Sequence, residues 1–339
     1  MVKKRHADKI LDAVQSPSQA AVSMLVASWR RSLMRHHLDP AQRSKNDLIT
    51  NTELKKLRES NENLLSISQT ALDKVFRSVG MAGCCVALTD INGIILEQRS
   101  TTQDKTDFMT MRVAEGGCWG EAHVGTNGIG TCLYENKPVT IYRDQHFAEQ
   151  NTTISCMDAP IYDPLGRLVA ALDISNCRDD FSPAMANMVS SLVLDAARQI
   201  ECAYFHHYFA HSRIIFIQET PRLGTAMLAV DRDDIVIGAT RAARSLLHLN
   251  DDQLTAGRSL DQLTGHDDMS HSFINAERAV LRQALVSVGG NASKAAKQLG
   301  IARATFYRRM ARIGLKADEQ KCPAQTKDKK PTHYRGPSL

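Results

Sequence analysis

The hydrophobic positions of this chain follow two periods, and the places where the period changes divide it into elements. Apolar residues repeat every three to four positions across 18–38 and from Ser182 to about Phe209, which predicts two amphipathic helices. Asn92-Gly93 interrupts an apolar run and is a strong signal for a hairpin. A sheet with helices at both ends predicts an α+β module of about 140 residues. The runs that predict its strands are 83–98, 137–142, 153–161 and 168–174.

A further apolar seam precedes this module and allows two interpretations. Its 3-4 steps fit a coiled-coil or dimer helix that leads into the domain. They fit equally well an ordinary helix on the surface of the domain that follows, and the sequence does not separate the two. The seam residues are Leu54, Leu57, Asn61, Leu64, Ser68, Ala71 and Val75.

Residues 214–263 hold a shorter mixed segment. Apolar stretches at 225–230 and 235–238 flank the acidic turn 231–234, and a helical pattern follows over 241–249. The segment therefore predicts strand, turn, strand and helix.

The last periodic stretch predicts two short helices joined by a glycine. Asn291 suits a helix N-cap, because its side chain can accept a backbone N–H bond, and Gly300 suits the left-handed residue that ends that helix. The second helix begins near Ala302 and gathers apolar residues on one face: Phe306, Met310 and Ile313. Two helices around a glycine turn, the second one basic, form the geometry that places a recognition helix in the major groove.

Charge is distributed unevenly along the chain. The whole sequence has 42 Lys and Arg against 37 Asp and Glu, yet residues 271–315 hold eight basic residues and one acid. Residues 316–339 hold six basic residues and three acids, so residues 1–270 are net acidic. A basic end on an acidic body indicates a nucleic-acid module joined to a different function. The competing interpretation is an amphipathic helical hairpin with a solvated charged face.

Composition predicts the cellular compartment of the protein and the redox state of its cysteines. No run of eighteen apolar residues occurs, and the basic start Met1–Lys9 lacks the apolar core of a signal peptide. We therefore expect a cytoplasmic protein without membrane contact. Its eight cysteines form no C-x-x-C pair, and we expect reduced thiols.

The basic helices resemble the C-terminal DNA-binding domain of Fis-type regulators. The matching residues are Gly290-Asn291, Ala295-Ala296, Leu299-Gly300-Ile301 and the run from Arg303 to Arg309. In that family the arginine after the turn reads a base edge, and later polar and basic residues hold phosphates. The resemblance therefore implies DNA contacts from Asn291, Arg303, Thr305, Tyr307, Arg308, Arg309 and Arg312.

Arg303 is the candidate base reader, because a guanidinium donates two hydrogen bonds to guanine O6 and N7. Ala302 stands where the family often has a polar residue, so one contact is expected to be missing. The resemblance also implies a homodimer on double-stranded DNA, with the helix near 273–288 at the dimer contact.

A second resemblance covers most of residues 20–180. The run Gly117–Thr131 is similar to the GAF domain of acetoin and glycerol catabolism regulators, and so are 138–147, 155–166 and 172–175. Ala27–Arg31, closing with Leu38-Asp39-Pro40, resembles the N-terminal signature of the same group. The resemblance implies a sensor of a small molecule or a partner protein. The segment 210–265 resembles the first half of a PAS domain.

The expected GAF pocket combines apolar surface with a few polar groups, as ligand sites do. We expect its lining to include Trp119, Glu121, His123, Asn127, Cys156 and Asp158. Gly125, Gly128 and Gly130 are interpreted as the start of a helix beside this pocket, because the strand and ribose acid of a nucleotide loop are missing. Asp163 and Asp173 are expected at turns and strand ends.

Two other chemistries are weighed against this interpretation. Zinc or iron would suit His123, Cys132, His146 and Cys156, but their irregular spacing favours structural side chains, so no metal, cofactor or catalytic residue is predicted. A thiol-based redox sensor or enzyme on a GAF fold stays open, with convergence of Cys84, Cys118 and Cys156.

The sequence departs from the resembled group in one respect that changes the mechanism. Full-length members place an ATPase between the sensor and the Fis-type domain, whereas here a short loop joins Leu263 to Phe273. The phosphate-binding pattern G-x-x-x-x-G-K-[ST] occurs nowhere in the sequence. We therefore expect no ATP hydrolysis and no remodelling of a sigma-54 polymerase.

Together these patterns predict an α+β multidomain chain. Its expected parts are an N-terminal helical segment (1–50), a GAF sensor with flanking dimer helices (51–209), a PAS-like segment (210–265), a Fis-type helix-turn-helix (271–315) and a disordered tail (316–339). The expected function is that of a one-component transcription regulator. We expect it to be associated with the nucleoid when it is bound to DNA, and RNA polymerase is a candidate partner. A nucleoid-like protein that bends DNA without sensing anything is a further alternative.

Overall fold

The computed structural model describes residues 5–15, 23–42, 48–221, 223–260, 263, 273–312 and 315. They belong to two compact units, Met1–Tyr208 and Phe209–Leu339, each of which is treated separately below. The expected tail 316–339 lies outside the described residues.

A five-stranded antiparallel sheet forms the centre of the first unit, in the order β2-β1-β5-β4-β3. The predicted hairpin is confirmed: Asp90 accepts the backbone N–H groups of Asn92 and Ile94 at 2.9 and 2.8 Å and so fixes the turn between β1 and β2. The strands are β1 (Cys84–Thr89), β2 (Ile95–Arg99), β3 (Val139–Tyr142), β4 (Ser155–Tyr162) and β5 (Leu168–Asn176).

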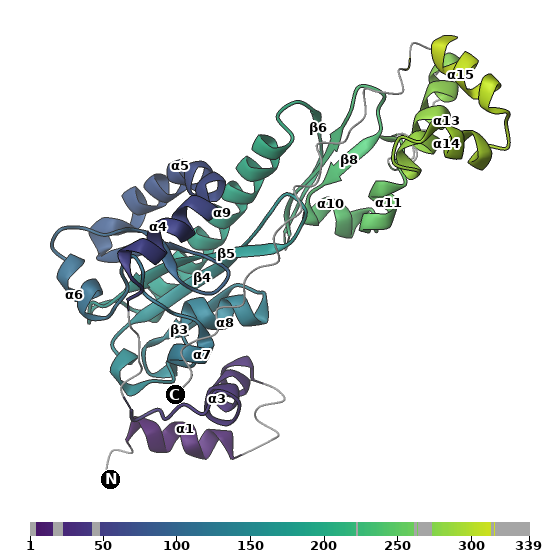
Figure 1. The fold of residues 1–339 in the computed structure, drawn as a ribbon. Helices are drawn as coiled ribbons and strands as arrows, with labels where there is room; N and C mark the ends of the chain where they lie inside the picture. The colour runs from purple at the N-terminus through teal and green to yellow at the C-terminus, as the bar shows by residue number, and fades with distance from the viewer. Residues whose placement is uncertain are drawn as a thin grey trace. The chain divides into compact units, whose positions relative to one another are not determined.

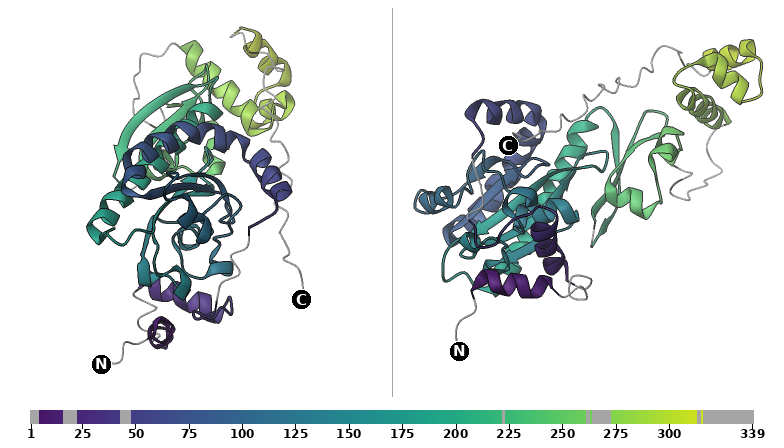
Figure 2. Two further views of the ribbon diagram at one scale, coloured as in Figure 1. Left: turned by 90° about the vertical axis from the view of Figure 1, so that its left-hand side faces the viewer. Right: turned by 60° about the horizontal axis from the view of Figure 1, so that its bottom comes forward.

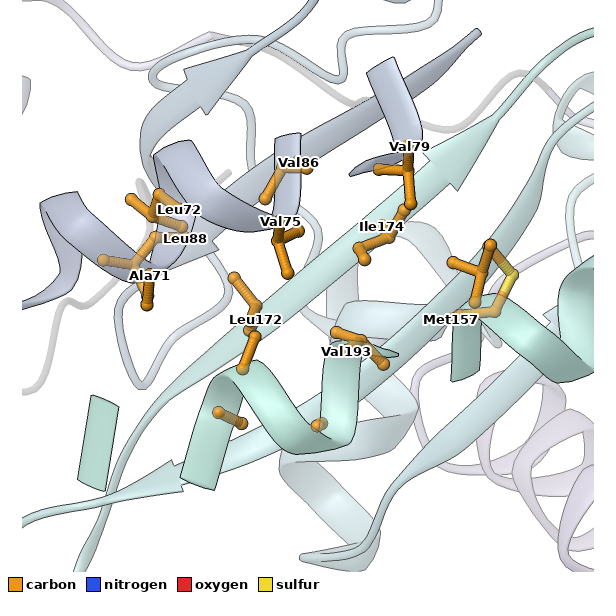
Figure 3. Packing of buried hydrophobic residues seen from close by; sticks show 14 of the residues in the cluster. Ala71, Leu72, Val75, Val79, Val86, Leu88, Met157, Leu172, Ile174 and Val193 are labelled. Atoms are coloured by element: carbon orange, nitrogen blue, oxygen red, sulfur yellow. The ribbon is translucent and has the colours of Figure 1, made fainter. Parts of the chain in front are cut away.

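Two long helices, α5 (Glu62–Val79) and α9 (Pro183–Tyr208), cover one face of this sheet (Figure 1). Their apolar stripes meet the side chains that alternate strand residues direct to this face, as the period of two requires. Figure 3 shows Val75 and Val79 of α5, Leu172 and Ile174 of β5 and Val193 of α9 in this core.

The seam before the sheet belongs to this core. The helix is interrupted at Asn61, which ends α4 (Asn51–Ser60) and precedes α5. Leu64, Ser68, Ala71 and Val75 are all buried within their own unit. The coiled-coil interpretation is therefore wrong for these four residues, since the face that a partner helix would need is occupied by the sheet and α9.

The opposite face of the sheet carries shorter elements. Helix α8 (Gly128–Glu135) contacts β4 and β5, and a second apolar cluster includes Cys85, Trp119, Ile129 and Cys156. The remaining helices of this part are α6 (Lys105–Thr110), α7 (Glu121–Val124) and the 3-10 turns η1 (Gly80–Ala82), η2 (Arg143–Gln145) and η3 (Glu149–Asn151).

Two N-terminal helices, α1 (His6–Val14) and α3 (Met24–Met34), lie beside each other (Figure 2). Ile10 and Trp29 form a small buried cluster with Phe147, so this segment packs against the rest of the first unit. Helix α1 lies within the expected N-terminal helical segment, although the periodicity predicted a helix only over 18–38. The part of the predicted helix before Ser23 lies outside the described residues.

The second unit begins with a three-stranded antiparallel sheet in the order β6-β7-β8. The predicted strands and helix are present as β7 (Gly224–Val230), β8 (Val236–Ala239) and α10 (Arg241–Leu246). Strand β6 (Arg213–Thr220) was missed, although its run of isoleucines and phenylalanine is rich in residues that favour strands. A short helix, α11 (Asp251–Thr255), follows.

Three helices complete the described part of this unit: α13 (Phe273–Ser287), α14 (Ala292–Gln298) and α15 (Arg303–Arg312). Their shared core contains Leu281, Leu285, Ala295, Phe306 and Met310. Among the described residues, no helix is long and apolar enough to cross a membrane.

Candidate functional site

The two C-terminal helices meet at the turn that the sequence predicted. Asn291 caps α14, because its side-chain oxygen accepts the backbone N–H groups of Ser293 and Lys294, each at 3.1 Å. Gly300 has a φ of +66°, the left-handed conformation that ends a helix at low cost in glycine. The cap uses the side-chain oxygen of Asn291, so that atom is already engaged within the protein.

Helix α15 separates its apolar and polar residues clearly. Phe306 is 0% exposed and Met310 2% exposed, so they fix the helix against α13 and α14. The guanidinium of Arg303 lies 5.6 Å from the centroid of the Tyr307 ring, a cation–π contact that restricts both side chains. Of the expected DNA contacts on this helix, Thr305 is half-buried and the exposed ones are Arg303, Tyr307, Arg308 and Arg309.

Part of the positive charge in this unit is compensated by nearby acids. Arg309 lies 3.5 Å from the carboxylate of Glu277 on α13. Arg282 on α13 pairs with Asp231 at 3.1 Å and also with Asp233. Arg303 and Arg308 are therefore the stronger candidates for DNA contact. The side chain of Arg312 lies outside the described residues.

The expected dimer contact requires apolar residues of α13 that are not already used in the three-helix core. Leu281 and Leu285 are 1% and 4% exposed inside the three-helix core, so neither is free to contact a second copy. Val280 is 49% exposed on the same helix. The side chains of Phe273 and Ile274 lie outside the described residues.

In the first unit, two carboxyl groups face each other inside the protein. Asp158 on β4 stands directly opposite Asp173 on β5, and their exposed fractions are 1% and 0%. Among the described residues, no N–H or hydroxyl group donates to Asp158, whose carboxyl hydrogen-bonds to that of Asp173. Asp173 differs, because the Ser175 hydroxyl donates to it at 2.8 Å. Carboxyl groups are rarely buried so completely, so this pair is unusual.

Burial and mutual repulsion change the titration of both groups. Burial raises the pKa of Asp173 to about 7. Burial, and then the negative charge of Asp173, raise the pKa of Asp158 well above its usual range. The pair therefore holds at least one proton over much of the neutral range.

A hydrogen-bonded chain extends from this pair to the loop after β3. Cys156 lies 3.2 Å from the Ser175 hydroxyl and 3.4 Å from Nε2 of His146. Because Nδ1 of His146 donates to the Arg143 carbonyl at 2.9 Å, Nε2 is the acceptor and the Cys156 thiol donates to it. Burial lowers the pKa of His146 to about 4, so this imidazole is neutral and supplies no counter-charge.

Glu121, another expected pocket residue, is bound to the N-terminal helix α3. Arg31 donates to both of its oxygens at 2.8 and 3.0 Å, and the Ser28 hydroxyl donates at 2.8 Å. Arg31 also pairs with Glu135 at 2.7 Å and lies 3.8 Å from the ring centroid of Tyr134. Glu121 thus joins the N-terminal segment to α7 and α8.

The remaining expected pocket residues lie apart from the carboxyl pair or serve the backbone. Trp119 donates to the Arg112 carbonyl at 2.9 Å, and Asn127 caps α8 by accepting the Gly130 N–H at 2.9 Å. The third, His123, is exposed on α7. Of the six expected residues, the structure brings Cys156 and Asp158 into one cluster.

Three members of this cluster were not expected there: His146, Asp173 and Ser175. Asp163 does serve a turn, accepting the N–H groups of Leu165 and Arg167, but the same expectation is wrong for Asp173, which lies within β5. The sequence contained a pattern that predicts the position of Asp173. An acid two residues before Ser175 in an otherwise apolar strand places both side chains on one face.

The cysteines do not form the cluster that a thiol mechanism requires. Cys84 packs on the face covered by α5 and α9, whereas Cys156 packs on the opposite face. Burial raises the pKa of both thiols, and a thiol rather than a thiolate is a poor nucleophile. Among the described residues, no group of three or more His, Cys, Asp or Glu side chains is arranged to hold a metal ion.

Comparison with known families identifies two regions. Residues 63–200 match the GAF domain, and residues 274–312 match the bacterial regulatory protein, Fis family. The chain therefore carries a GAF domain followed by a Fis-type helix-turn-helix. The predicted fold class, an α+β chain with these two parts, is confirmed.

Three curated relatives of this chain are named as transcription regulators. The acetoin catabolism regulatory protein of Cupriavidus necator is 24% identical over 239 residues, which cover 69% of this chain and 36% of the relative. The acetoin dehydrogenase operon transcriptional activator AcoR of Bacillus subtilis is 25% identical, with 52% and 29% covered. The propane 2-monooxygenase operon transcriptional activator MimR of Mycolicibacterium smegmatis is 26% identical, with 62% and 38% covered. The chain thus spans well under half the length of these three relatives.

Among solved structures, the Escherichia coli DhaR(N)-DhaL complex aligns with a TM-score of 0.48 and 14% identity. The alignment covers 71% of this chain and 81% of that chain.

Proposed function

We propose that this chain is a cytoplasmic transcription regulator that binds double-stranded DNA as a homodimer through α14 and α15. The observation that carries the proposal is the exposed basic face of α15, which follows a capped helix and a left-handed glycine turn in the region that matches the Fis family. The exposed arginine at the start of α15 supports the proposal, since the first residues of a recognition helix reach the base edges.

We infer further that the GAF domain makes DNA occupancy conditional. Two of the relatives are named for acetoin catabolism and for a propane 2-monooxygenase operon, and a regulator of such genes needs a signal from a small molecule or a partner protein. The supporting observation is the cluster of buried polar side chains around Asp158, because a domain that served only as a spacer would not need it.

We also propose that the chain acts by its position on DNA and not through an ATPase. The described residues between the two matched regions form a three-stranded sheet and short helices, and the sequence contains no G-x-x-x-x-G-K-[ST] pattern. Its regulatory effect would then come from contact with RNA polymerase or from competition with an ATPase-bearing relative for the same sites.

The decisive experiment replaces Arg303 and Arg308 together by alanine. Mapping of bound genomic sites first supplies a target, and fluorescence anisotropy then measures affinity for it. We expect the double variant to lose roughly 100-fold or more in affinity, because one bidentate base contact alone contributes about 1–3 kcal/mol.

The matched control is Arg77→Ala, which removes an exposed arginine from α5 of the sensor unit. It should leave affinity for DNA unchanged. If the double variant bound as tightly as the unaltered chain, α15 would not be the recognition helix.

A further inference from the structure

Strand β6 lies at the edge of the three-stranded sheet of the second unit. It pairs with β7 on one side, and among the described residues no strand pairs with its other side. An antiparallel edge strand directs about half of its backbone N–H and C=O groups away from the sheet, where a further strand can pair with them. The run Ile214–Ile217 favours such pairing, because isoleucine and phenylalanine have high β propensity.

The middle of β6 lacks the residues that usually protect a free edge. The strand is eight residues long and contains no lysine and no proline, and Phe216 at its centre is 63% exposed. Its register against β7 shifts between Phe216 and Gln218, which indicates a bulge near Ile217. Ile215 and Ile217 nevertheless both pack against the buried cluster of the sheet, so the two faces of β6 remain distinct.

The sequence of β6 is complementary to itself in an antiparallel register centred on Phe216. In that register Phe216 lies opposite Phe216 of a second copy, and Ile215 lies opposite Ile217. Arg213 then lies opposite Glu219, so opposite charges face each other at both ends of the paired segment. Apolar pairs and opposite charges at facing positions stabilise antiparallel strands. A parallel pairing in register would instead place Arg213 opposite Arg213 and Glu219 opposite Glu219.

We propose that two copies of this chain pair through β6, in antiparallel orientation about a two-fold axis at Phe216. The inference rests on the proposed homodimer and gives it a contact surface in addition to α13. A second copy is the occupant that fits this edge, because a two-fold axis brings the same strand opposite itself. The pairing joins two three-stranded sheets into one continuous sheet. Each outer edge is then β8, which is four residues long, so association ends at the dimer.

The two charged residues are available for a partner. Arg213 pairs with Asp234, and these side chains are 57% and 43% exposed. Glu219 is exposed as well and accepts the hydroxyl hydrogen of Thr225 at 2.8 Å. Exposed ion pairs contribute little to stability, so both side chains can turn to a second copy at small cost.

The test is sedimentation equilibrium of the full chain without DNA over a range of concentrations. Phe216→Glu places two carboxylates opposite each other at the axis and should raise the dissociation constant of the dimer by about tenfold or more. Ile237→Glu is the matched control, because Ile237 is 43% exposed on β8 at the opposite edge of the same sheet. It should leave the dissociation constant unchanged. Circular dichroism establishes that both variants are folded.

Exchange of the two charges tests the register. Arg213→Glu and Glu219→Arg should each raise the dissociation constant by about threefold or more, because like charges then face each other at both ends. The double variant should return it to within about twofold of the value for the unaltered chain. Asp234 neighbours position 213 in the single and the double variant alike, so the recovery reports the contact with the second copy.

Hydrogen exchange locates the contact independently. At protein concentrations above the dissociation constant, the β6 amides should exchange more slowly than at concentrations below it, because pairing protects those directed outward. The β8 amides should exchange equally at both concentrations. Slower exchange in β8 with no change in β6 would place the contact at the other edge.

Three results would overturn the proposal. They are unchanged association of Phe216→Glu, an equal loss of association in Ile237→Glu, and no recovery in the double charge variant. DNA affinity is measured on the same preparations. If the unaltered chain binds DNA while the β6 variants associate normally, the β6 contact alone is wrong. If the unaltered chain does not bind DNA, the proposed regulator role fails independently.

Discussion

At the scale of single residues, Asp158 and Asp173 make the stability of the first unit depend on pH. Both pKa values are raised on folding, so the folded protein holds more protons than the unfolded chain. Stability is therefore greatest in mild acid. It falls as the pH rises above about 4, the ordinary value of an aspartate, and through the folded value of Asp173, which is about 7.

Asp158→Asn should reduce this loss, because the amide cannot ionise and can donate to the Asp173 carboxylate. We expect the variant to unfold about 2–4 °C above the unaltered chain at pH 8, which corresponds to about 1 kcal/mol, and to differ less at pH 5. Differential scanning calorimetry at the two pH values measures this. An equal rise in unfolding temperature at both pH values would mean that the charge of Asp158 is not the cause. Asp180→Asn, at an exposed aspartate of the same unit, is the control and should leave the unfolding temperature unchanged.

At the scale of elements, the cap of α14 determines how firmly the first DNA-binding helix is held. Asn291→Ala removes the acceptor for two backbone N–H groups and should cost about 1 kcal/mol of local stability. Hydrogen exchange of the α14 amides in the full chain should then be about fivefold faster, at unchanged exchange in α9. Asn187→Ala, at an exposed position of α9, serves as the control.

The contact between α3 and α7 is the second feature at this scale. Arg31→Met leaves the Glu121 carboxylate, whose side chain is 4% exposed, without its ionic partner. We expect a loss of roughly 2–3 kcal/mol, below the range for fully buried pairs because Arg31 keeps some access to solvent. The double variant Arg31→Met with Glu121→Gln should recover part of this loss in urea unfolding. No recovery would indicate that Arg31 acts through its contact with Tyr134 instead.

At the scale of the whole molecule, the proposed dimer depends on α13. Val280 is the described apolar residue that remains exposed on this helix, because Leu281 and Leu285 are used in the internal core. Val280→Glu should weaken self-association by about tenfold or more, since a carboxylate would be buried at the contact. Sedimentation without DNA measures the association. Met81→Glu, at an exposed methionine of the first unit, should leave it unchanged.

Local signals in the sequence were sufficient for several features of this protein. Asn92-Gly93 predicted the first hairpin, and the alternation of residues around it predicted strands on both sides. Asn291 and Gly300 predicted the ends of α14, because a cap and a left-handed residue depend on atoms only a few positions away. The separation of apolar and basic residues in α15 likewise follows from its helical period.

Other features depend on which segments meet, and the sequence did not decide them. The seam through Leu64, Ala71 and Val75 is apolar in either interpretation, and only the presence of the sheet and α9 shows that it is internal. Glu121 had the composition of a pocket residue, yet Arg31, ninety positions away, occupies its carboxylate. Tertiary contact sets such roles because a side chain's partner is fixed by distance in space and not along the chain.

The sequence by itself therefore determined that a basic helix-turn-helix follows a sheet-containing domain, because periodicity, caps and charge are local properties. The tertiary structure decided where the GAF domain is chemically distinctive. Asp158 and Asp173 come from two different strands, and their opposition depends on the register between β4 and β5. A shift of one residue would direct one carboxyl to the other face, so only the folded sheet could reveal the pair.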